Sequence, residues 1–334
     1  MDSDHALFSN MLHLNNNSVS VVKYSAELKD QWDDFVFNSK NGIFLFYRDY
    51  LEYHSDRFLD HSLVFIKNKK IVGLLPANMK KNTLYSHEGL TFGGIISGFN
   101  MKTLLMLEIF DKLIQYCQSM EIMEIEYKAI PSIYHSVPAE EDLYALFRLN
   151  AKLIGRNVSS TIFLPKKTIY DHDKKNSIEK GKKNNLVVKR SDDLNQFMEI
   201  AREVVKTRHG VKLAHKTEEI ESLAKRFPDN IKLFASYREE VMLAGVVVYE
   251  SANVAHAQYA ANSKEGRTIG AEDIIFDYLI NDYYKEKKYF DFGISTEKLG
   301  QELNAGLIGY KEDFGARAIM HDLYKISPLT IGAR

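Results

Sequence analysis

The sequence predicts a mixed α/β protein, more specifically α+β, built from two tandem units that each carry a twisted mixed sheet flanked by helices. The chain has 334 residues, which is enough for two domains with separate cores. Its residues are 45% hydrophobic and 12% aromatic, a composition typical of packed globular proteins. The same order of predicted elements also recurs at an offset of about 168 residues, which indicates a duplicated unit.

In the first half, the predicted elements begin with a helix over residues 25–39 and two strands over 62–67 and 70–79. A second helix is predicted over 101–120, because apolar residues recur there at the spacing of one helical face, at Leu104, Leu107, Phe110 and Ile114. A strand over 122–128 follows. This half is predicted to be a unit over residues 20–165.

The second half repeats this order, with a helix over 191–205 and strands over 231–238 and 242–250. A third β-rich run over 253–263 leads into a helix over 271–286 and a last strand over 289–295. The second unit is predicted to cover residues 191–326.

A basic connector is predicted between the units, over residues 166–190. It carries nine Lys or Arg residues against three Asp or Glu residues. One interpretation is a solvated surface helix and loop. The other is a basic rim that steers a polyphosphate ligand into a cleft between the units, with Lys180, Lys182 and Lys183 as its best members.

Charge and cysteine content narrow the classes of function. The net charge of −1 provides no global field that would attract nucleic acid or an anionic membrane. The single cysteine, Cys117, excludes an intramolecular disulfide and a multi-cysteine metal site, and we expect a buried, inert thiol and no metal. No secretory signal or apolar span of membrane length is apparent, so a cytoplasmic protein without membrane insertion is expected. A homodimer is compatible with the sequence.

The turn before residue 271 predicts an anion site. Strand-like runs feed a segment with Arg267, Thr268, Ile269, Gly270 and Ala271, at which a helix begins. The first N–H groups of a helix have no partner within the helix, and its dipole is positive at that end. This turn is therefore predicted to bind the phosphates of a cofactor.

The order Arg-x-x-Gly-Ala resembles the Gln/Arg-x-x-Gly-x-Gly/Ala loop with which acyltransferases of the GNAT superfamily hold the pyrophosphate of coenzyme A. Four longer segments, at residues 86–95, 130–148, 208–215 and 290–316, resemble the tandem-GNAT Fem-type peptidyltransferases and their relatives. Within that group, the likeness is greatest to the CoA-dependent branch that acylates nucleotide-linked amino sugars, such as dTDP-amino sugars of surface polysaccharides. The resemblance covers roughly residues 20–325 and implies that coenzyme A, as acyl-CoA, binds the second unit, because the first has no Arg-x-x-Gly at its helix start.

Amide formation from a thioester needs a neutral amine, an oxyanion stabiliser and a proton exit. The GNAT resemblance implies an oxyanion donor near Gln258, Tyr259 and Ala260. As proton acceptors we rank His209 first and Glu88 second, with direct release to water as a third route. His87 lies in the same turn as Glu88, whereas His215 and His256 rank lower, because His256 alternates with apolar neighbours along its strand.

The remaining candidates are expected at the acceptor and at the mouth of the site. We expect the acceptor between the two halves, bounded by the turn of His87 and Glu88 and by Arg208 and His209. Residues at a strand end and in the following segment are predicted to bind ligand, Asn304 on the cofactor side and Asp291, Ser295 and Lys311 on the substrate side. Tyr134 and Arg148 are predicted to reach a nucleotide base or phosphate.

Two other functions stay open. One is an aminoacyl-tRNA-dependent peptide ligase of cell-wall synthesis, against which the net charge of −1 and the absence of coiled-coil heptads argue. The other is a non-catalytic binding module, against which the Arg267–Ala271 loop argues.

Overall fold

The computed structural model describes residues 18–206, 213 and 215–332. The chain forms two compact units, of which the first comprises Met1–Arg156 with His321–Arg334 and the second comprises Asn157–Met320. In the described residues, no helix has the length and apolar character needed to span a membrane.

Within its described residues, the first unit holds two groups of strands and four α-helices. Antiparallel strands form one sheet in the order β1-β3-β4-β7, and the order β17-β8-β6-β5-β2 forms the other group. The strands are β1 (Ser20–Lys23), β2 (Leu59–Asp60), β3 (Leu63–Lys67), β4 (Lys70–Leu75), β5 (Asn78–Lys80), β6 (Thr83–Tyr85), β7 (Ile96–Ser97), β8 (Glu124–Lys128) and β17 (Arg317–Ile326). The helices are α2 (Lys29–Phe37), α3 (Arg48–Leu51), α4 (Thr103–Ser119) and α5 (Glu141–Arg148), with a short 3₁₀ helix η3 (Ser132–Tyr134).

The second unit is built on the strand order β10-β11-β12-β13-β14-β9. Its strands are β9 (Lys152–Phe163), which begins in the first unit, β10 (Val187–Ser191), β11 (Ile231–Arg238), β12 (Val241–Glu250), β13 (Val254–Asn262) and β14 (Tyr289–Ile294). A two-stranded hairpin of β15 (Thr296–Glu297) and β16 (Glu302–Leu303) follows. The helices are α6 (His172–Lys183), α7 (Leu194–Lys206), α8 (Thr217–Arg226), α9 (Lys264–Ile269), α10 (Ala271–Tyr278), which continues into a π-helical turn (Leu279–Tyr283), and α11 (Ala305–Glu312).

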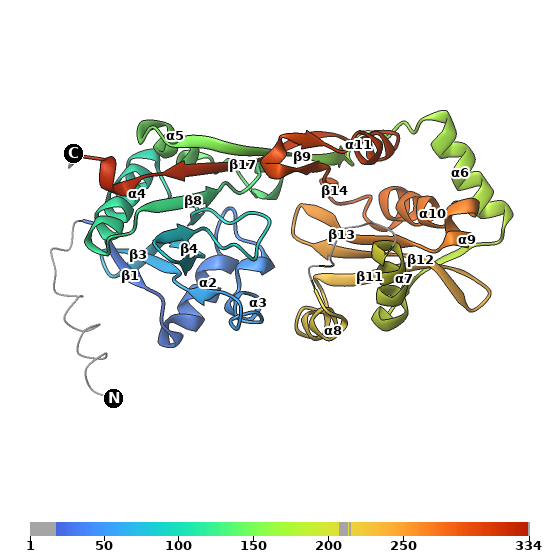
Figure 1. The fold of residues 1–334 in the computed structure, drawn as a ribbon, viewed down its shortest axis with the longest axis horizontal. Helices are drawn as coiled ribbons and strands as arrows, with labels where there is room; N and C mark the ends of the chain where they lie inside the picture. Colours follow the sequence, from blue (N-terminus) through green and yellow to red (C-terminus); the bar gives the residue numbers. More distant parts are fainter. Residues whose placement is uncertain (1–17, 207–212, 214, 333–334) are drawn as a thin grey trace. The chain divides into compact units, whose positions relative to one another are not determined.

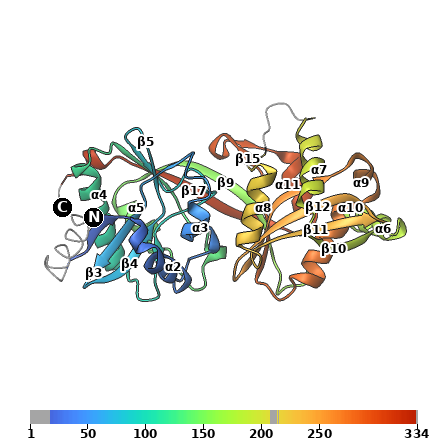
Figure 2. The same ribbon diagram turned by 90° about the horizontal axis from the view of Figure 1, so that it is seen from below.

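Helices cover both faces of the sheet in the second unit. Helix α10 packs on one face of β11, β12 and β13, whereas α7 and α8 lie on the other, as Figures 1 and 2 show. The core beneath α10 is strongly aromatic and contains the buried rings of Phe234, Phe276, Phe290 and Phe314. Burial of one such side chain contributes about 1.5–3 kcal/mol, so this layer fixes the helix on the sheet.

Both units contain a parallel strand pair within otherwise mostly antiparallel pairing. In the first unit, β6 runs parallel to β8, and in the second, β13 runs parallel to β14. Helix α4 precedes β8 and helix α10 precedes β14, so each pair is joined by a crossover that carries a helix. The mixed sheets and the recurring order of elements confirm the predicted fold class.

The limits of the units differ from the sequence-based boundaries. The segment 166–190 is not a linker, because it forms α6 and β10, which belong to the second unit. Helix α6 packs against α10 and places Ile178 in the aromatic core, while Lys180, Lys182 and Lys183 stay exposed. The end of the chain returns as β17 to pair with β8 of the first unit, although the sequence placed residues up to 326 in the second.

The packing of α7 on the sheet gives a testable consequence at Gly245 of β12. A Cβ atom at this position would lie 2.5 Å from Cδ2 of the buried Phe197 on α7. Because such overpacking forces neighbours apart, we expect Gly245→Ala to lower the free energy of unfolding by about 1–3 kcal/mol. Urea denaturation measures this loss.

Gly309→Ala on α11 is the matched control, since a Cβ atom there meets no atom within 4 Å. An alanine inside a helix is better than glycine by about 0.5–1 kcal/mol, so this variant should be as stable as the wild type or slightly more stable. Equal stability of both variants would show that α7 does not pack on the sheet as described.

Candidate functional site

The pairing of β13 with β14 ends after three residue pairs. Val254 pairs with Tyr289, Ala255 with Phe290 and His256 with Asp291, and beyond this point the two strands are no longer paired. On its other side, β13 continues along β12 to Asn262, with a bulge at Gln258 where the register shifts. A bulge leaves its extra residue outside the ladder, so backbone groups in this stretch are available to a ligand.

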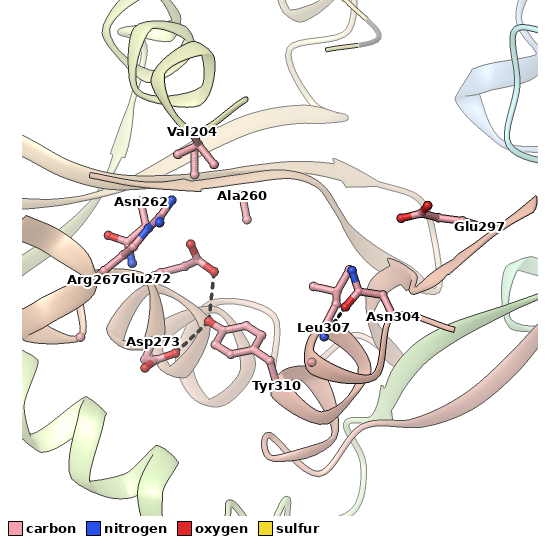
Figure 3. A pocket seen from close by; sticks show the side chains of 13 residues that line it. Val204, Ala260, Asn262, Arg267, Glu272, Asp273, Glu297, Asn304, Leu307 and Tyr310 are labelled. Atoms are coloured by element: carbon pink, nitrogen blue, oxygen red, sulfur yellow. Dashed lines mark hydrogen bonds between the residues drawn. The ribbon is translucent and has the colours of Figure 1, made fainter. Parts of the chain in front are cut away.

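A pocket of about 690 Å³ opens beside the unpaired end of β13. We call it the splay pocket, and Figure 3 shows the side chains around it. Its lining comes from α7, β13, α9, α10, the β15–β16 hairpin and α11, through Val204, Ala260, Ala261, Asn262, Arg267, Gly270, Glu272, Asp273, Glu297, Asn304, Gly306, Leu307 and Tyr310. Its volume lies within the range of small-molecule and cofactor sites.

Four of the residues predicted to bind the cofactor line this pocket. Ala260, Arg267, Gly270 and Asn304 all contribute to its wall, and Figure 3 places Arg267 and Glu297 at opposite ends. Asn304 also caps α11, because its side-chain oxygen accepts a hydrogen bond from the N–H of Leu307 at 3.0 Å. The lining does not include Gln258, Tyr259, Thr268, Ile269 or Ala271.

Gly270 has a role that the sequence did not predict. The residue has a φ of 77° and joins α9 to α10 in the left-handed conformation that favours glycine. A Cβ atom there would lie 2.2 Å from the carbonyl oxygen of Ser177 on α6. The missing side chain therefore lets α6 approach the same turn that is predicted to bind phosphates.

Two carboxylates stand at the start of α10, where the resemblance implies a phosphate. The sixth position of the expected loop motif, counted from Arg267, should be Gly or Ala, but this chain has Glu272. Glu272 and the adjacent Asp273 both line the splay pocket, and the hydroxyl of Tyr310 on α11 lies 3.0 Å from Glu272 Oε1 and 2.8 Å from Asp273 Oδ1. Burial raises the pKa of Glu272, with the neighbouring charge of Asp273 acting in the same direction.

Glu272 and Asp273 form what we call the acidic wall of the splay pocket. A buried lysine compensates for part of the negative charge of this wall. Lys174 of α6 is 6% exposed, and its Nζ lies 3.2 Å from Asp273 Oδ1 and 3.7 Å from the ring centre of Tyr310. The hydroxyl of Ser177 donates to the other oxygen of Asp273. Lys174 therefore forms an ion pair with Asp273 from outside the pocket, and the charges of Lys174 and Arg267 also act on Glu272.

Asp291 and His256 form a hydrogen-bonded pair on the two strands. Asp291 is fully buried, and its Oδ2 accepts a hydrogen bond from His256 Nδ1 at 2.7 Å. Its Oδ1 accepts from the hydroxyls of Ser159 at 2.6 Å and Thr161 at 2.7 Å, both on β9. Asp291 therefore lies behind His256 and does not face a ligand directly, contrary to its predicted role.

Lys311 and Ser295 also turn inward. The Nζ atom of Lys311 donates to the carbonyl oxygens of Gly293 at 2.8 Å and Ile294 at 2.9 Å and to the hydroxyl of Ser295 at 2.9 Å. All three ammonium donors are used, and Lys311 and Ser295 are 6% and 1% exposed. These contacts fix the backbone at the end of β14. Lys311 and Ser295 are therefore not placed to contact substrate, which differs from the role that the sequence predicts for them.

Comparison with known protein families gives a match for most of the second half of the chain. Residues 166–312 match the family model described as an acetyltransferase (GNAT) domain. This part of the chain has the GNAT fold. No curated protein matches the chain.

The solved structures that resemble this one extend over both units. The crystal structure of FemX is 13% identical, with a TM-score of 0.64, and the match covers 91% of this chain and 96% of that one. A conserved protein of unknown function from Bacteroides thetaiotaomicron is 12% identical, with a TM-score of 0.61 and coverage of 92% and 99%. L-PGS from Bacillus licheniformis is 12% identical, with a TM-score of 0.59 and coverage of 90% and 91%. At such identities the likeness shows a shared fold alone.

The candidate residues of the first unit lie outside the matched residues 166–312, and His87 among them is enclosed. His87 is 2% exposed and stacks on His54 with ring centres 4.9 Å apart, and burial lowers its pKa to about 3. It is therefore neutral and shielded, which does not suit a proton acceptor. Glu88 is half-buried and bonded to Asn78 at 2.9 Å and to Lys80 at 3.1 Å.

Half-buried Lys128 of β8 forms hydrogen bonds to this turn of the first unit. Its Nζ atom donates to the carbonyl oxygens of His87 at 3.2 Å, Glu88 at 3.4 Å and Leu90 at 2.7 Å. Burial lowers the pKa of Lys128 to about 8. The end of the β6–β8 pair is thus closed by a protein side chain.

Tyr134 and Arg148 do not form one site. Tyr134 is 7% exposed and packs on Phe92, with ring centres 4.6 Å apart. Arg148 is exposed at the end of α5, where it lies against Tyr144. The predicted Arg208 and His209 lie outside the described residues, so the first-ranked proton acceptor stays a prediction.

Several residues that shape the site were not predicted from sequence. Glu272, Asp273 and Tyr310 line the pocket, and His256 is held by Asp291 at the end of the paired strands. The signal for Glu272 was present in the motif spacing, whereas no local pattern joins Tyr310 to α10. Among the described residues, no group of three or more His, Cys, Asp or Glu is arranged to hold a metal ion.

The inward position of Lys311 predicts a pH-dependent stability. Burial lowers the pKa of Lys311 from 10.5 to about 8. Between these values the unfolded chain binds more protons than the folded one, so the free energy of unfolding rises with pH, by up to about 3 kcal/mol. This contribution is complete above the unfolded pKa and is lost as the pH falls through the folded pKa.

We expect Lys311→Met to lack this rise, which urea denaturation at pH 7 and pH 10 measures. Lys128 contributes in the same pH range and in the same direction, so the comparison is between the slopes of wild type and variant. Parallel curves for the two proteins would contradict the buried, charged state of Lys311 near neutral pH.

Proposed function

We propose that the protein is an N-acyltransferase that takes an acyl group from acyl-CoA in the splay pocket and passes it to the amino group of a nucleotide-linked amino deoxy sugar. One observation carries the donor assignment. The pocket lies at the unpaired end of β13 in a GNAT domain, with Arg267 and Gly270 in its wall. The guanidinium of Arg267 suits a phosphate oxygen, and the first N–H groups of α10 lie next to it.

The acceptor follows from the resemblance to the CoA-dependent branch of the Fem-type proteins. The specific reaction that this resemblance favours is transfer of a 3-hydroxybutanoyl group to dTDP-3-amino-3,6-dideoxy-D-galactose for surface polysaccharide synthesis. Direct transfer in a ternary complex is proposed, because the single cysteine is unsuited to an acyl-enzyme. Cys117 is fully buried in α4, and burial raises the pKa of its thiol to about 12.

Arg267→Ala tests the donor assignment. If Arg267 binds the pyrophosphate of coenzyme A, its loss removes a charge-assisted hydrogen bond worth about 1.5–3 kcal/mol. We therefore expect the affinity for acetyl-CoA, measured by isothermal titration calorimetry, to fall by about 10- to 100-fold.

The control is Arg317→Ala, which removes an exposed arginine of β17 that does not line the pocket. It should bind acetyl-CoA as the wild type does. Equal affinity for acetyl-CoA of the wild type and both variants would contradict the binding of acyl-CoA in the splay pocket.

The acidic wall favours a second candidate function, aminoacyl-tRNA-dependent transfer as implied by the resemblance to Fem-type peptidyltransferases. Glu272 lies at the start of α10 in the pocket wall, where it repels a pyrophosphate but attracts the α-ammonium group of an aminoacyl ester. In this case the pocket would receive the aminoacyl end of the tRNA instead of coenzyme A.

Glu272→Gln separates the two candidates, because it removes the charge and keeps the size of the side chain. For an acyl-CoA enzyme we expect acetyl-CoA to bind more tightly, by several-fold, because the repulsion disappears. For an aminoacyl-tRNA enzyme we expect turnover of an alanyl-tRNA microhelix to fall by at least 10-fold, because the ammonium group loses its partner. The two measurements are calorimetry and release of deacylated RNA.

The wild-type protein provides the decisive comparison. Binding of acetyl-CoA with no use of the alanyl microhelix supports the first candidate, and the reverse result supports the second. A protein that neither binds acetyl-CoA nor uses the microhelix, nor acylates an amino sugar, would contradict both.

A further inference from the structure

His256 lies at the point where the parallel strands part. It is the last residue of β13 that pairs with β14, and its partner in the register is Asp291. In a mixed sheet this place is special, because the next residues of the two strands diverge and leave backbone and side chains accessible between them. A side chain here stands at the base of the opening beside which the splay pocket lies.

Asp291 fixes the orientation of the imidazole ring. Its Oδ2 accepts from Nδ1 of His256 at 2.7 Å, and its Oδ1 is bound by the hydroxyls of Ser159 and Thr161. A carboxylate oxygen only accepts hydrogen bonds, so Nδ1 of a neutral His256 carries the proton. The other nitrogen, Nε2, then has the lone pair that can accept a proton.

The pair lies on the sheet face opposite to α10. Phe290 and Phe292, the neighbours of Asp291 along β14, both belong to the core beneath α10. Because side chains alternate along a strand, Asp291 points to the other face, and His256 shares that face through its hydrogen bond. The acidic wall with Glu272 is on the α10 side, so His256 and the proposed donor phosphate site approach the opening from different sides.

The residue next to the imidazole ring of His256 is a glycine, which has no side chain to crowd the ring. Gly293 has a φ of 79°, and a Cβ atom at this residue would lie 3.2 Å from Cε1 of His256. The side chain of His256 is 17% exposed, and within the described part of the chain no hydrogen bond to its Nε2 is formed. The nitrogen that carries the lone pair is therefore left for a ligand.

We propose that His256 is the proton acceptor of the transfer reaction and that Asp291 is its positioning residue. The inference rests on the proposed transfer of an acyl group to an amine, and it holds for either donor. The amine nitrogen bonds to the carbonyl carbon, and the bond from this carbon to the leaving sulfur, or to the leaving oxygen of an aminoacyl ester, breaks. The proton lost by the nitrogen passes to Nε2 of His256 and from there to the leaving group.

Other nearby groups do not take this role. Lys311 of α11, whose charge interacts with that of Asp291, uses its three donors on Gly293, Ile294 and Ser295. On the same strand, the hydroxyl of Tyr259 is bound to His215 Nδ1 at 2.5 Å, and burial raises the pKa of Tyr259 to about 12. Ser159 and Thr161, which face Asp291 from β9, do not titrate in the physiological range.

The first experiment tests the ring without any substrate. Nitrogen NMR of protein labelled with ¹⁵N-histidine, assigned with His256→Gln, should show His256 protonated at Nδ1 and unprotonated at Nε2 when neutral. In Asp291→Asn the fixed preference for this tautomer should be lost. A neutral His256 with its proton on Nε2 overturns the proposal, whatever the protein acylates.

The second experiment uses turnover of acyl-CoA with an amino sugar, or of the alanyl microhelix, whichever the wild type accepts. His256→Gln should lower kcat by about 100- to 10,000-fold and remove the acidic limb of the pH–rate profile, with donor affinity within about two-fold of wild type. Asp291→Asn should give a smaller loss of kcat. The control is His172→Gln, which removes an exposed histidine at the start of α6 and should keep wild-type kcat.

The outcomes separate this inference from the proposed function. If the wild type transfers no acyl group from any of these donors, the proposed function fails, and the NMR result alone decides whether Asp291 sets the tautomer of His256. If the wild type is active and His256→Gln keeps its kcat and pH profile, the function stands and the role of His256 is overturned. If His256→Gln unfolds at the wild-type Tm, misfolding is excluded as the cause of a lower kcat. The kcat of Asp291→Asn is interpreted only if this variant has the same Tm.

Discussion

The short pairing between β13 and β14 is the constraint on which the site depends. A parallel pair in the middle of a sheet normally continues along its strands, but here it ends at His256 and Asp291 while β13 remains bonded to β12. Backbone groups and side chains beyond this point cannot satisfy one another across the gap. The splay pocket, the bulge at Gln258 and the inward-turned Lys311 all occur around this interruption.

Holding two strands apart requires support behind them. Lys311 donates hydrogen bonds to the last two carbonyl groups of β14, and Asp291 accepts hydrogen bonds from two hydroxyl groups of β9. On the far side, α6 packs against the turn at Gly270 so closely that a side chain there would meet its backbone. The opening is thus a rigid feature of the GNAT domain, because buried polar contacts and aromatic packing fix both of its edges.

Local periodicity allowed the fold to be predicted, whereas the site depended on contacts that the sequence does not display. The strand at 231–238 and the helix starting at 271 agree with prediction, because apolar spacing and turns are local signals. The sequence predicts ligand contacts for Asp291 and Lys311, but both side chains turn inward, and the direction of a side chain depends on the partner strand. His256 ranked low because its apolar neighbours are adjacent in sequence, while the carboxylate that orients it comes from another strand.

The two units differ at the ends of their parallel strand pairs, because a lysine closes the end of the β6–β8 pair in the first unit. In the first unit, the ammonium group of Lys128 already occupies the carbonyl groups of the turn, much as a bound amine would. The strand end of the first unit is therefore occupied by a side chain of the same chain, whereas the corresponding strand end of the second unit opens onto the splay pocket.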